Sequence, residues 1–161
     1  MLSRINAVCS EKVQTAALLH DVARDLPIEL MRETLQRRGV WSDSFADFSD
    51  NPLLLHAHAG RVIAQTDFGV ADGEILRSIE LHTTGGSYMS ALEKVIFVAD
   101  FIEPGRSFRG VETARRLAQK SLDETILYIY KFILRHLLRR ELFICNNTLL
   151  GYNEVVLKEK K

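Results

Sequence analysis

The chain has 161 residues, of which 47% are hydrophobic, and its 21 basic side chains balance 21 acidic ones. This length supports one domain with a sizeable core, over residues 1–161, and leaves little room for a second. The formal net charge of zero argues against a general electrostatic attraction to nucleic acid or to anionic membranes. No run approaches the ~18 apolar residues of a membrane helix, and no secretory signal opens the chain. The two cysteines are far apart and indicate free thiols, so we expect a soluble cytoplasmic protein.

Apolar residues recur at three- and four-residue intervals nearly throughout, which is the period of amphipathic helices. In the first part of the chain, Ser10 is expected to cap a helix that stops at Leu26 and Pro27. Pro27 then opens a short second helix, which Gly39 closes. The Ser- and Asp-rich residues 40–50 are expected to form a loop.

Caps and helix breakers predict the remaining helices in the same way. The expected starts are Asn51 with Pro52, Asp72, Ser87 or Ser90, and about Val111, with a break near Ser121 and a last short helix from Thr148. The expected stops are Gly85 with Gly86, Pro104 with Gly105, and Leu142. No strand-like alternation and no internal repeat stands out. We therefore predict an all-α domain of about six to eight helices.

Five polar residues lie near the predicted helix ends or on apolar helix faces. They are His20, Asp21, His56, His82 and Asp100. An unpaired polar group in such surroundings costs about 1–3 kcal/mol, so burying several is unfavourable unless they converge on a shared partner. Imidazole nitrogen and carboxylate oxygen are ligands for divalent iron, manganese or zinc. A shared metal ion would satisfy these groups together, and the pattern predicts a metal-centred hydrolase.

Four strings of the sequence resemble the YqeK-like branch of the HD-domain phosphohydrolases. They are LLHDVARDLP at 18–27, LLHAHAG at 54–60, LHTTG at 81–85 and LEKVIFVADFIEPGRSFRGV at 92–111. The last string is the most specific, and the resemblance extends from about Val13 to the C-terminus. It implies an HD-domain helical fold and a two-metal centre, commonly of iron, with manganese, zinc or magnesium as other possibilities. It also implies symmetrical hydrolysis of dinucleoside tetraphosphates, such as diadenosine tetraphosphate, to two nucleoside diphosphates.

The resemblance assigns a role to each of the five polar residues. Asp21 is implied to be catalytic, bridging two metal ions. His20 and Asp100 are implied to complete the first metal site, and His56 and His82 the second. We expect their side chains to converge in one cavity.

The resemblance also implies residues that bind the substrate. Arg24 is implied to be catalytic as well, because it stands where related enzymes often place a Lys near the scissile phosphate, and its fork-shaped charge suits phosphate oxygens. Thr83 follows a ligand directly and is implied to bond to phosphate. Arg106 and Arg109 are candidates to hold the polyphosphate, although an exposed loop charge is an equally good interpretation of both.

Two other histidines are not expected to be ligands. His58 lies two positions after His56 in a helix and therefore points away from it. His136 lies in a basic run, since residues 106–140 hold nine basic and three acidic side chains. Such a run is most often a solvated helix face and less often an anion site.

The resemblance further implies a metal-ligating His in a helix upstream of His20, and no His occurs among residues 1–19. We therefore expect an N-terminally short domain with a weakened first metal site. A groove beside Val13 and Ala17 would be left uncovered, and a homodimer is expected to form through it.

Three functional classes stay open. The leading one is a symmetrical dinucleoside tetraphosphatase. The second is an HD phosphohydrolase acting on another nucleotide, such as a deoxynucleoside phosphate or a cyclic dinucleotide. The third is a non-catalytic remnant that binds a nucleotide or a partner helix. In the leading interpretation the partner is a nucleotide substrate, with neither nucleic acid nor membrane bound.

Overall fold

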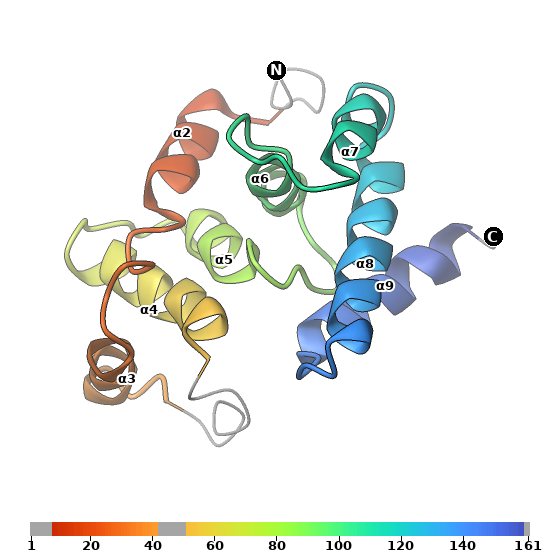
Figure 1. Ribbon diagram of the computed structural model, residues 1–161. Helices are drawn as coiled ribbons and strands as arrows, with labels where there is room; N and C mark the ends of the chain where they lie inside the picture. Colours follow the sequence, from red (N-terminus) through yellow and green to blue (C-terminus); the bar gives the residue numbers. More distant parts are fainter. Residues whose placement is uncertain (1–7, 42–50, 160–161) are drawn as a thin grey trace.

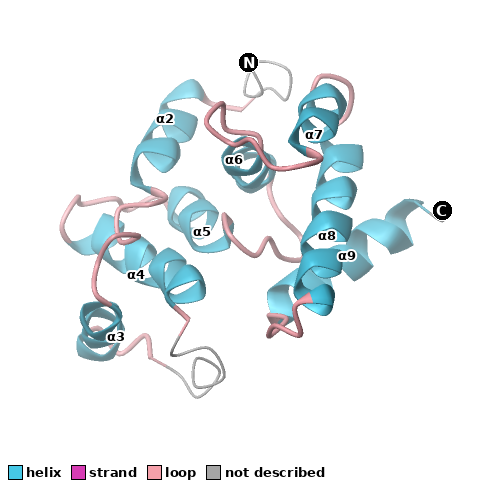
Figure 2. Cartoon of the chain, viewed as in Figure 1, coloured by secondary structure: helices cyan, strands magenta, loops and turns pink. Residues whose placement is uncertain are grey.

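The structure is a computed structural model that describes residues 8–41 and 51–159, and these contain eight α-helices and no strand (Figure 2). In chain order the helices are α2 (Ser10–Leu19), α3 (Ile28–Arg37), α4 (Pro52–Thr66), α5 (Gly73–Leu81), α6 (Ala91–Phe101), α7 (Val111–Ala118), α8 (Leu122–Arg139) and α9 (Asn146–Glu159). The all-α prediction is therefore confirmed. None of the described helices is long and apolar enough to cross a membrane.

Helix α5 lies in the middle of the packing, in contact with α2, α4 and α6 (Figure 1). On one side α3 packs on α4, and on the other α8 packs on α6 and carries α7 and α9. Three apolar clusters hold these helices together, one between α3 and α4, one among α2, α5 and α6, and one joining α6 to α8 and α9. This arrangement brings the ends of α2, α5 and α6 close to the start of α4.

Side-chain caps begin four of the helices where the sequence predicts them. Asn51, Asp72, Ser90 and Ser121 each accept a hydrogen bond from a backbone N–H in the first turn of α4, α5, α6 and α8. At Ser90 the bond is reciprocal, because Glu93 accepts from the Ser90 N–H in a capping box. Of the two predicted starts of this helix, Ser87 and Ser90, the structure therefore selects Ser90. Gly39, which follows the C-cap residue Arg38 of α3, adopts a φ of +64°, as a C-terminal glycine should.

The first helix is shorter than predicted. It ends at Leu19, and the residues up to Leu26 form tight turns in which the N–H groups of Val22, Arg24 and Leu26 donate to the carbonyl three residues back. One cause is His20, whose Nδ1 lies 2.8 Å from the Ala17 carbonyl, the acceptor that a continuing helix would offer to the Asp21 N–H. The helix begins after Cys9, which makes no side-chain cap, so the prediction of Ser10 as the cap is wrong.

The last helix is longer than predicted, with 14 residues, and begins at Asn146 rather than at Thr148. Thr148 faces inward and donates to the Thr84 carbonyl at 3.0 Å, which attaches α9 to the loop after α5. The loop predicted at 40–50 lies outside the described residues except for positions 40 and 41. In α2, Val13 packs against the core, whereas Ala17 is exposed.

Candidate metal centre

The structure brings the five predicted polar residues together from four helices. His20 and Asp21 directly follow α2, and His82 directly follows α5. His56 lies in the second turn of α4, and Asp100 lies at the end of α6. The rings of His20 and His56 each lie 4.9 Å from the ring of His82, measured between centroids.

Asp21 stands at the centre of this group, and its two oxygens face different partners. Oδ1 lies 3.2 Å from His56 Nε2 and 3.4 Å from His82 Nε2. Oδ2 lies 3.5 Å from His20 Nε2, which in turn is 3.7 Å from Asp100 Oδ1. The carboxylate therefore separates a pair of histidines on one side from a His and an Asp on the other.

Backbone carbonyls fix the orientation of all three imidazole rings. The Nδ1 atoms of His20, His56 and His82 lie 2.8, 3.2 and 2.6 Å from the carbonyls of Ala17, Pro52 and Ile79. Because a carbonyl only accepts, each Nδ1 carries a hydrogen, and in the neutral ring each Nε2 presents a lone pair to Asp21. The same arrangement is common around metal-ligating histidines, where a hydrogen bond behind the ring sets the tautomer.

Among the described residues, the inner side of the cluster has more acceptors than donors, because the Thr83 hydroxyl, 3.0 Å from His82 Nε2, can donate to only one of them. The Nε2 atoms of His56 and His82 lie 3.0 Å apart, although both present lone pairs. Asp21 Oδ1, which both of them face, is buried and accepts no hydrogen bond in the described part of the chain. Such an arrangement is unfavourable without a positive charge at its centre. The donor set of imidazole nitrogen and carboxylate oxygen therefore fits a divalent metal ion.

At His56 and Asp21, electrostatics favour the protonation states that bind metal. Burial lowers the pKa of His56, and the neighbouring His82 lowers it further, so the ring is neutral at neutral pH. Burial opposes the ionisation of Asp21, but its contacts with His82 and Arg24 hold its pKa well below the ordinary range. Neutral imidazole and ionised carboxylate are the forms that coordinate a cation.

The outer side of the cluster is more open to solvent. Its side chains are 22% exposed at His20 and 20% at Asp100, against 3% at His56. The nearby Asp100 carboxylate raises the pKa of His20 against the effect of burial. Burial opposes the ionisation of Asp100, yet His20 and Arg106 lower its pKa. This side is where a ligand from solution can approach.

Three of the four predicted substrate residues lie at the cluster. Arg24 Nη1 is 2.7 Å from Asp21 Oδ2, and Arg106 Nη2 is 2.8 Å from Asp100 Oδ1. Thr83 Oγ1 is 3.0 Å from His82 Nε2. The fourth residue, Arg109, lines a separate hollow beside α8.

The two histidines that were not expected to be ligands take other positions. His58 Nδ1 lies 3.2 Å from Glu80 on α5, and His136 is exposed on α8 beside Arg109. Sequence reasoning missed the ion pairs that Arg24 and Arg106 make with carboxylates of the cluster. It also missed the backbone acceptors behind the rings, for which the position of a His directly after a helix was an available signal.

An all-helical fold that joins His and Asp side chains from four helices around one carboxylate defines a domain of the HD type. The HD-domain profile matches residues 1–105. The chain belongs to the HD-domain family, and the resemblance seen in the four strings is confirmed.

Relatives with known names are similar over most of the chain. The symmetrical bis(5'-nucleosyl)-tetraphosphatase of Bacillus subtilis is 37% identical over 147 residues, which cover 91% of this chain and 77% of the relative. The enzyme of the same name from Halalkalibacterium halodurans is 35% identical over 159 residues, covering 99% and 83%. A crystal structure of a predicted HD superfamily hydrolase involved in NAD metabolism, from Clostridium acetobutylicum, superposes with a TM-score of 0.91 at 35% identity, covering 98% and 82%.

Proposed function

We propose that this chain is a metal-dependent phosphohydrolase that splits dinucleoside tetraphosphates symmetrically, converting diadenosine tetraphosphate to two molecules of ADP. The observation that carries the proposal is Asp21, whose two oxygens face two separate sets of ligand atoms. A carboxylate in this position suits a bridge between two cations. The names of the relatives from Bacillus subtilis and Halalkalibacterium halodurans support the substrate class.

The residues of the cluster divide into two metal sites. Asp21 Oδ2, His20 and Asp100 would hold the first ion, and Asp21 Oδ1, His56 and His82 the second. Iron suits this mixture of imidazole and carboxylate, as do manganese and zinc. The chemistry that two such ions would supply is a lowered pKa for a bound water, so that hydroxide is available for attack on phosphorus, and compensation of the charge on the phosphate oxygens.

Side chains at the open edge of the cluster would orient the polyphosphate. Arg24 and Arg106 present planar guanidinium groups that suit phosphate oxygens, and their side chains are 39% and 34% exposed. Arg24 remains charged at all working pH values, so it binds and orients rather than donating a proton. The Thr83 hydroxyl lies beside His82 and can donate to a phosphate oxygen.

Asp21→Asn tests the proposal, because it keeps the shape of the side chain and removes the charge that both metal sites share. We expect metal content to fall and ADP formation to slow by at least about 100-fold. Asp25→Asn is the matched control, since Asp25 is exposed four residues further on. Elemental analysis, release of ADP from diadenosine tetraphosphate, and melting with and without chelator give three readouts. Metal at 100 times its Kd should stabilise the unsubstituted protein by about 2.7 kcal/mol.

Unchanged metal content and ADP release in Asp21→Asn would contradict the proposal. If the protein hydrolyses a deoxynucleoside phosphate or a cyclic dinucleotide faster than diadenosine tetraphosphate, the proposed substrate class is wrong and that nucleotide takes its place. Metal-free protein that binds nucleotide without turnover would identify a non-catalytic binding protein. The weakened first metal site and the homodimer through Val13 and Ala17 stay predictions, which metal stoichiometry and sedimentation velocity test.

A further inference from the structure

A hollow of about 780 Å³ lies between the loop before α7 and one face of α8. Its lining includes three arginines, Arg109, Arg135 and Arg139, together with His136 and the rings of Tyr128 and Phe132. The residues from α8 recur at three- and four-residue spacing, so they share one face of the helix. The volume is in the range of small-molecule binding sites.

The hollow has an excess of positive charge that the protein does not neutralise. Among residues 8–41 and 51–159, no carboxylate lines it, and none of its three arginine side chains has a hydrogen-bond or ion-pair partner. Nearby arginines differ, since Arg106 pairs with Asp100 and Arg115 donates to Glu112 and to backbone carbonyls. Guanidinium groups that converge without a partner suit a ligand with several negative charges.

The aromatic part of the hollow is held in place by its surroundings. The Tyr128 hydroxyl donates to the Gly110 carbonyl at 3.0 Å. Gly110 has a φ of +109°, and a Cβ there would meet Tyr128 Oη at 2.7 Å, so the contact requires glycine. The Phe132 ring packs at 5.0 Å against Phe108 and at 5.4 Å against Phe101. Fixed aromatic surfaces of this kind suit the flat face of a nucleobase.

A single loop connects the hollow to the metal centre. It follows α6, brings Arg106 to Asp100, and three residues later contributes Arg109 to the hollow. The Cα atoms of these two arginines lie within about 11 Å, because three residues can span no more. Phe101, which follows Asp100 directly, belongs to the ring cluster behind Phe132. This spacing is within the reach of a ligand that carries a chain of phosphates.

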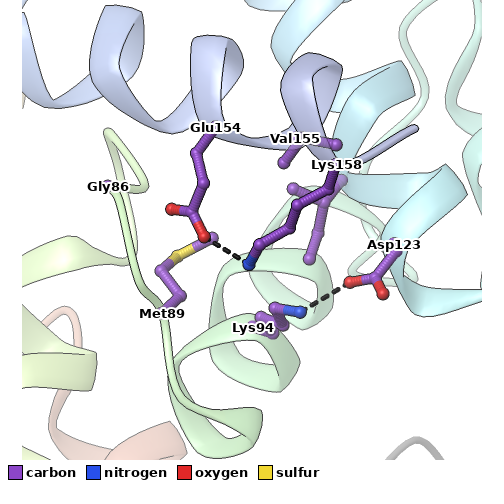
Figure 3. Close-up of a pocket in the computed structure, with 8 residues that line it drawn as sticks. Gly86, Met89, Lys94, Asp123, Glu154, Val155 and Lys158 are labelled. Atoms are coloured by element: carbon purple, nitrogen blue, oxygen red, sulfur yellow. Dashed lines mark hydrogen bonds and ion pairs between the residues drawn. The ribbon is translucent and has the colours of Figure 1, made fainter. Parts of the chain in front are cut away.

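A second pocket provides a contrast. It has a volume of about 200 Å³ and lies among α6, α8 and α9, where Figure 3 shows its side chains. Both of its lysines are neutralised, because Lys158 donates to Glu154 and Lys94 lies 2.6 Å from Asp123. Because both lysines are already paired with carboxylates, this pocket attracts an anionic ligand much less strongly than the hollow does.

We propose that the hollow beside α8 binds one nucleotide half of the substrate. The base lies against Tyr128 and Phe132, and Arg109, Arg135 and Arg139 contact the phosphates that lead to the metal centre. This inference rests on the proposed function for the identity of the ligand. Symmetrical cleavage requires a fixed spacing between a nucleoside and the scissile bond, and a nucleotide site beside the metal centre provides it.

The test is calorimetric titration of ADP into the full chain with chelator present, so that metal does not contribute to binding. Arg135→Ala with Arg139→Ala should weaken the binding of ADP on the order of tenfold for each guanidinium removed. Lys131→Ala with Arg140→Ala is the matched control, because it removes two exposed charges from the same helix and its C-cap outside the hollow. In turnover, the first double variant should raise KM for diadenosine tetraphosphate and leave kcat nearly unchanged.

Equal ADP affinity in both double variants would overturn the inference, as would inorganic phosphate binding as tightly as ADP. Tighter binding of a single-stranded oligonucleotide than of ADP would overturn it in favour of a nucleic-acid site. The proposed function can fail separately. A chain that binds ADP through Arg135 and Arg139 but releases no ADP from diadenosine tetraphosphate, with any metal, would retain the nucleotide site and lose the hydrolase.

Discussion

Tyr130→Phe removes one oxygen atom from the point where α8, α9 and the loop after α5 meet. Tyr130 is fully buried, and its hydroxyl accepts from the Gly86 N–H at 2.9 Å and donates to the Gly86 carbonyl at 3.3 Å. A Cβ on Gly85 or Gly151 would come within 2.2 or 2.1 Å of this oxygen, so the backbone closes around it. Phenylalanine would leave a buried N–H without a partner.

The expected loss is about 1–3 kcal/mol in the free energy of unfolding, which is the usual effect of an unsatisfied buried donor. For a chain of this size each kcal/mol lowers Tm by about 2–4 °C. The loop that Tyr130 holds begins at Thr83, directly after His82, so the variant should also bind metal more weakly. Chemical denaturation and metal titration measure the two effects.

The pH dependence of stability gives a second, independent readout. Burial raises the pKa of Tyr130 to about 12 from an ordinary value of 10.0. A raised folded-state pKa contributes stability below pH 10 that is lost as the pH rises toward 12. At pH 11 the contribution has fallen by about 1.4 kcal/mol, and the difference between the protein and Tyr130→Phe should shrink by that amount.

Tyr88→Phe is the control, because Tyr88 is 81% exposed and its hydroxyl should matter little. Surface substitutions usually change the free energy of unfolding by no more than about 0.5 kcal/mol. A change as small as this in Tyr130→Phe would refute the reasoning. So would a stability difference that stays constant between pH 8 and pH 11.

Two further predictions concern Glu93, which is buried, and Glu80, which is half-buried. Glu93→Ala should lower the free energy of unfolding by about 2 kcal/mol, because Glu93 accepts from Arg77 and completes the cap of α6; an unchanged urea midpoint would contradict this. Burial opposes the ionisation of Glu80, yet His58 and Arg61 lower its pKa below the ordinary 4.5. The ionised Glu80 carboxylate therefore contributes stability that is present above pH 4.5 and is lost as the pH falls. Glu80→Gln should for that reason lose less Tm on acidification than the unsubstituted protein does. Parallel plots of Tm against pH for the two proteins would refute this prediction.

Helix starts were predictable because they depend on neighbours in sequence. Asn51, Asp72 and Ser90 each cap a helix through an N–H two or three residues away, and such contacts need no knowledge of the fold. The end of the first helix and the start of the last were not predictable in this way. They depend on His20 turning toward the cluster and on Thr148 reaching a loop 64 residues away.

The same limit applies to the candidate site. The sequence named the five polar residues that meet, because buried His and Asp are unfavourable in apolar helices. It named both Arg106 and Asp100 but not the ion pair between them, and it placed Arg109 at the polyphosphate without predicting the hollow beside α8. Arg135 and Arg139 were visible only as part of a basic run. Which members of such a run face one another is decided by packing between helices.

Two of the three histidines of the cluster lie at the end of a helix in the same local arrangement, which links the fold to the site. His20 and His82 each directly follow the last residue of a helix, and each donates through Nδ1 to the carbonyl three residues back. Carbonyls in the last turn of a helix have no amide partner, so they are available to a side chain. The bond to Ala17 withholds that carbonyl from the Asp21 N–H and favours the end of the helix, while it also turns Nε2 toward the Asp21 carboxylate. The end of the helix and the orientation of the metal-facing nitrogen thus have one cause, so a substitution that lengthens either helix should disorder the centre.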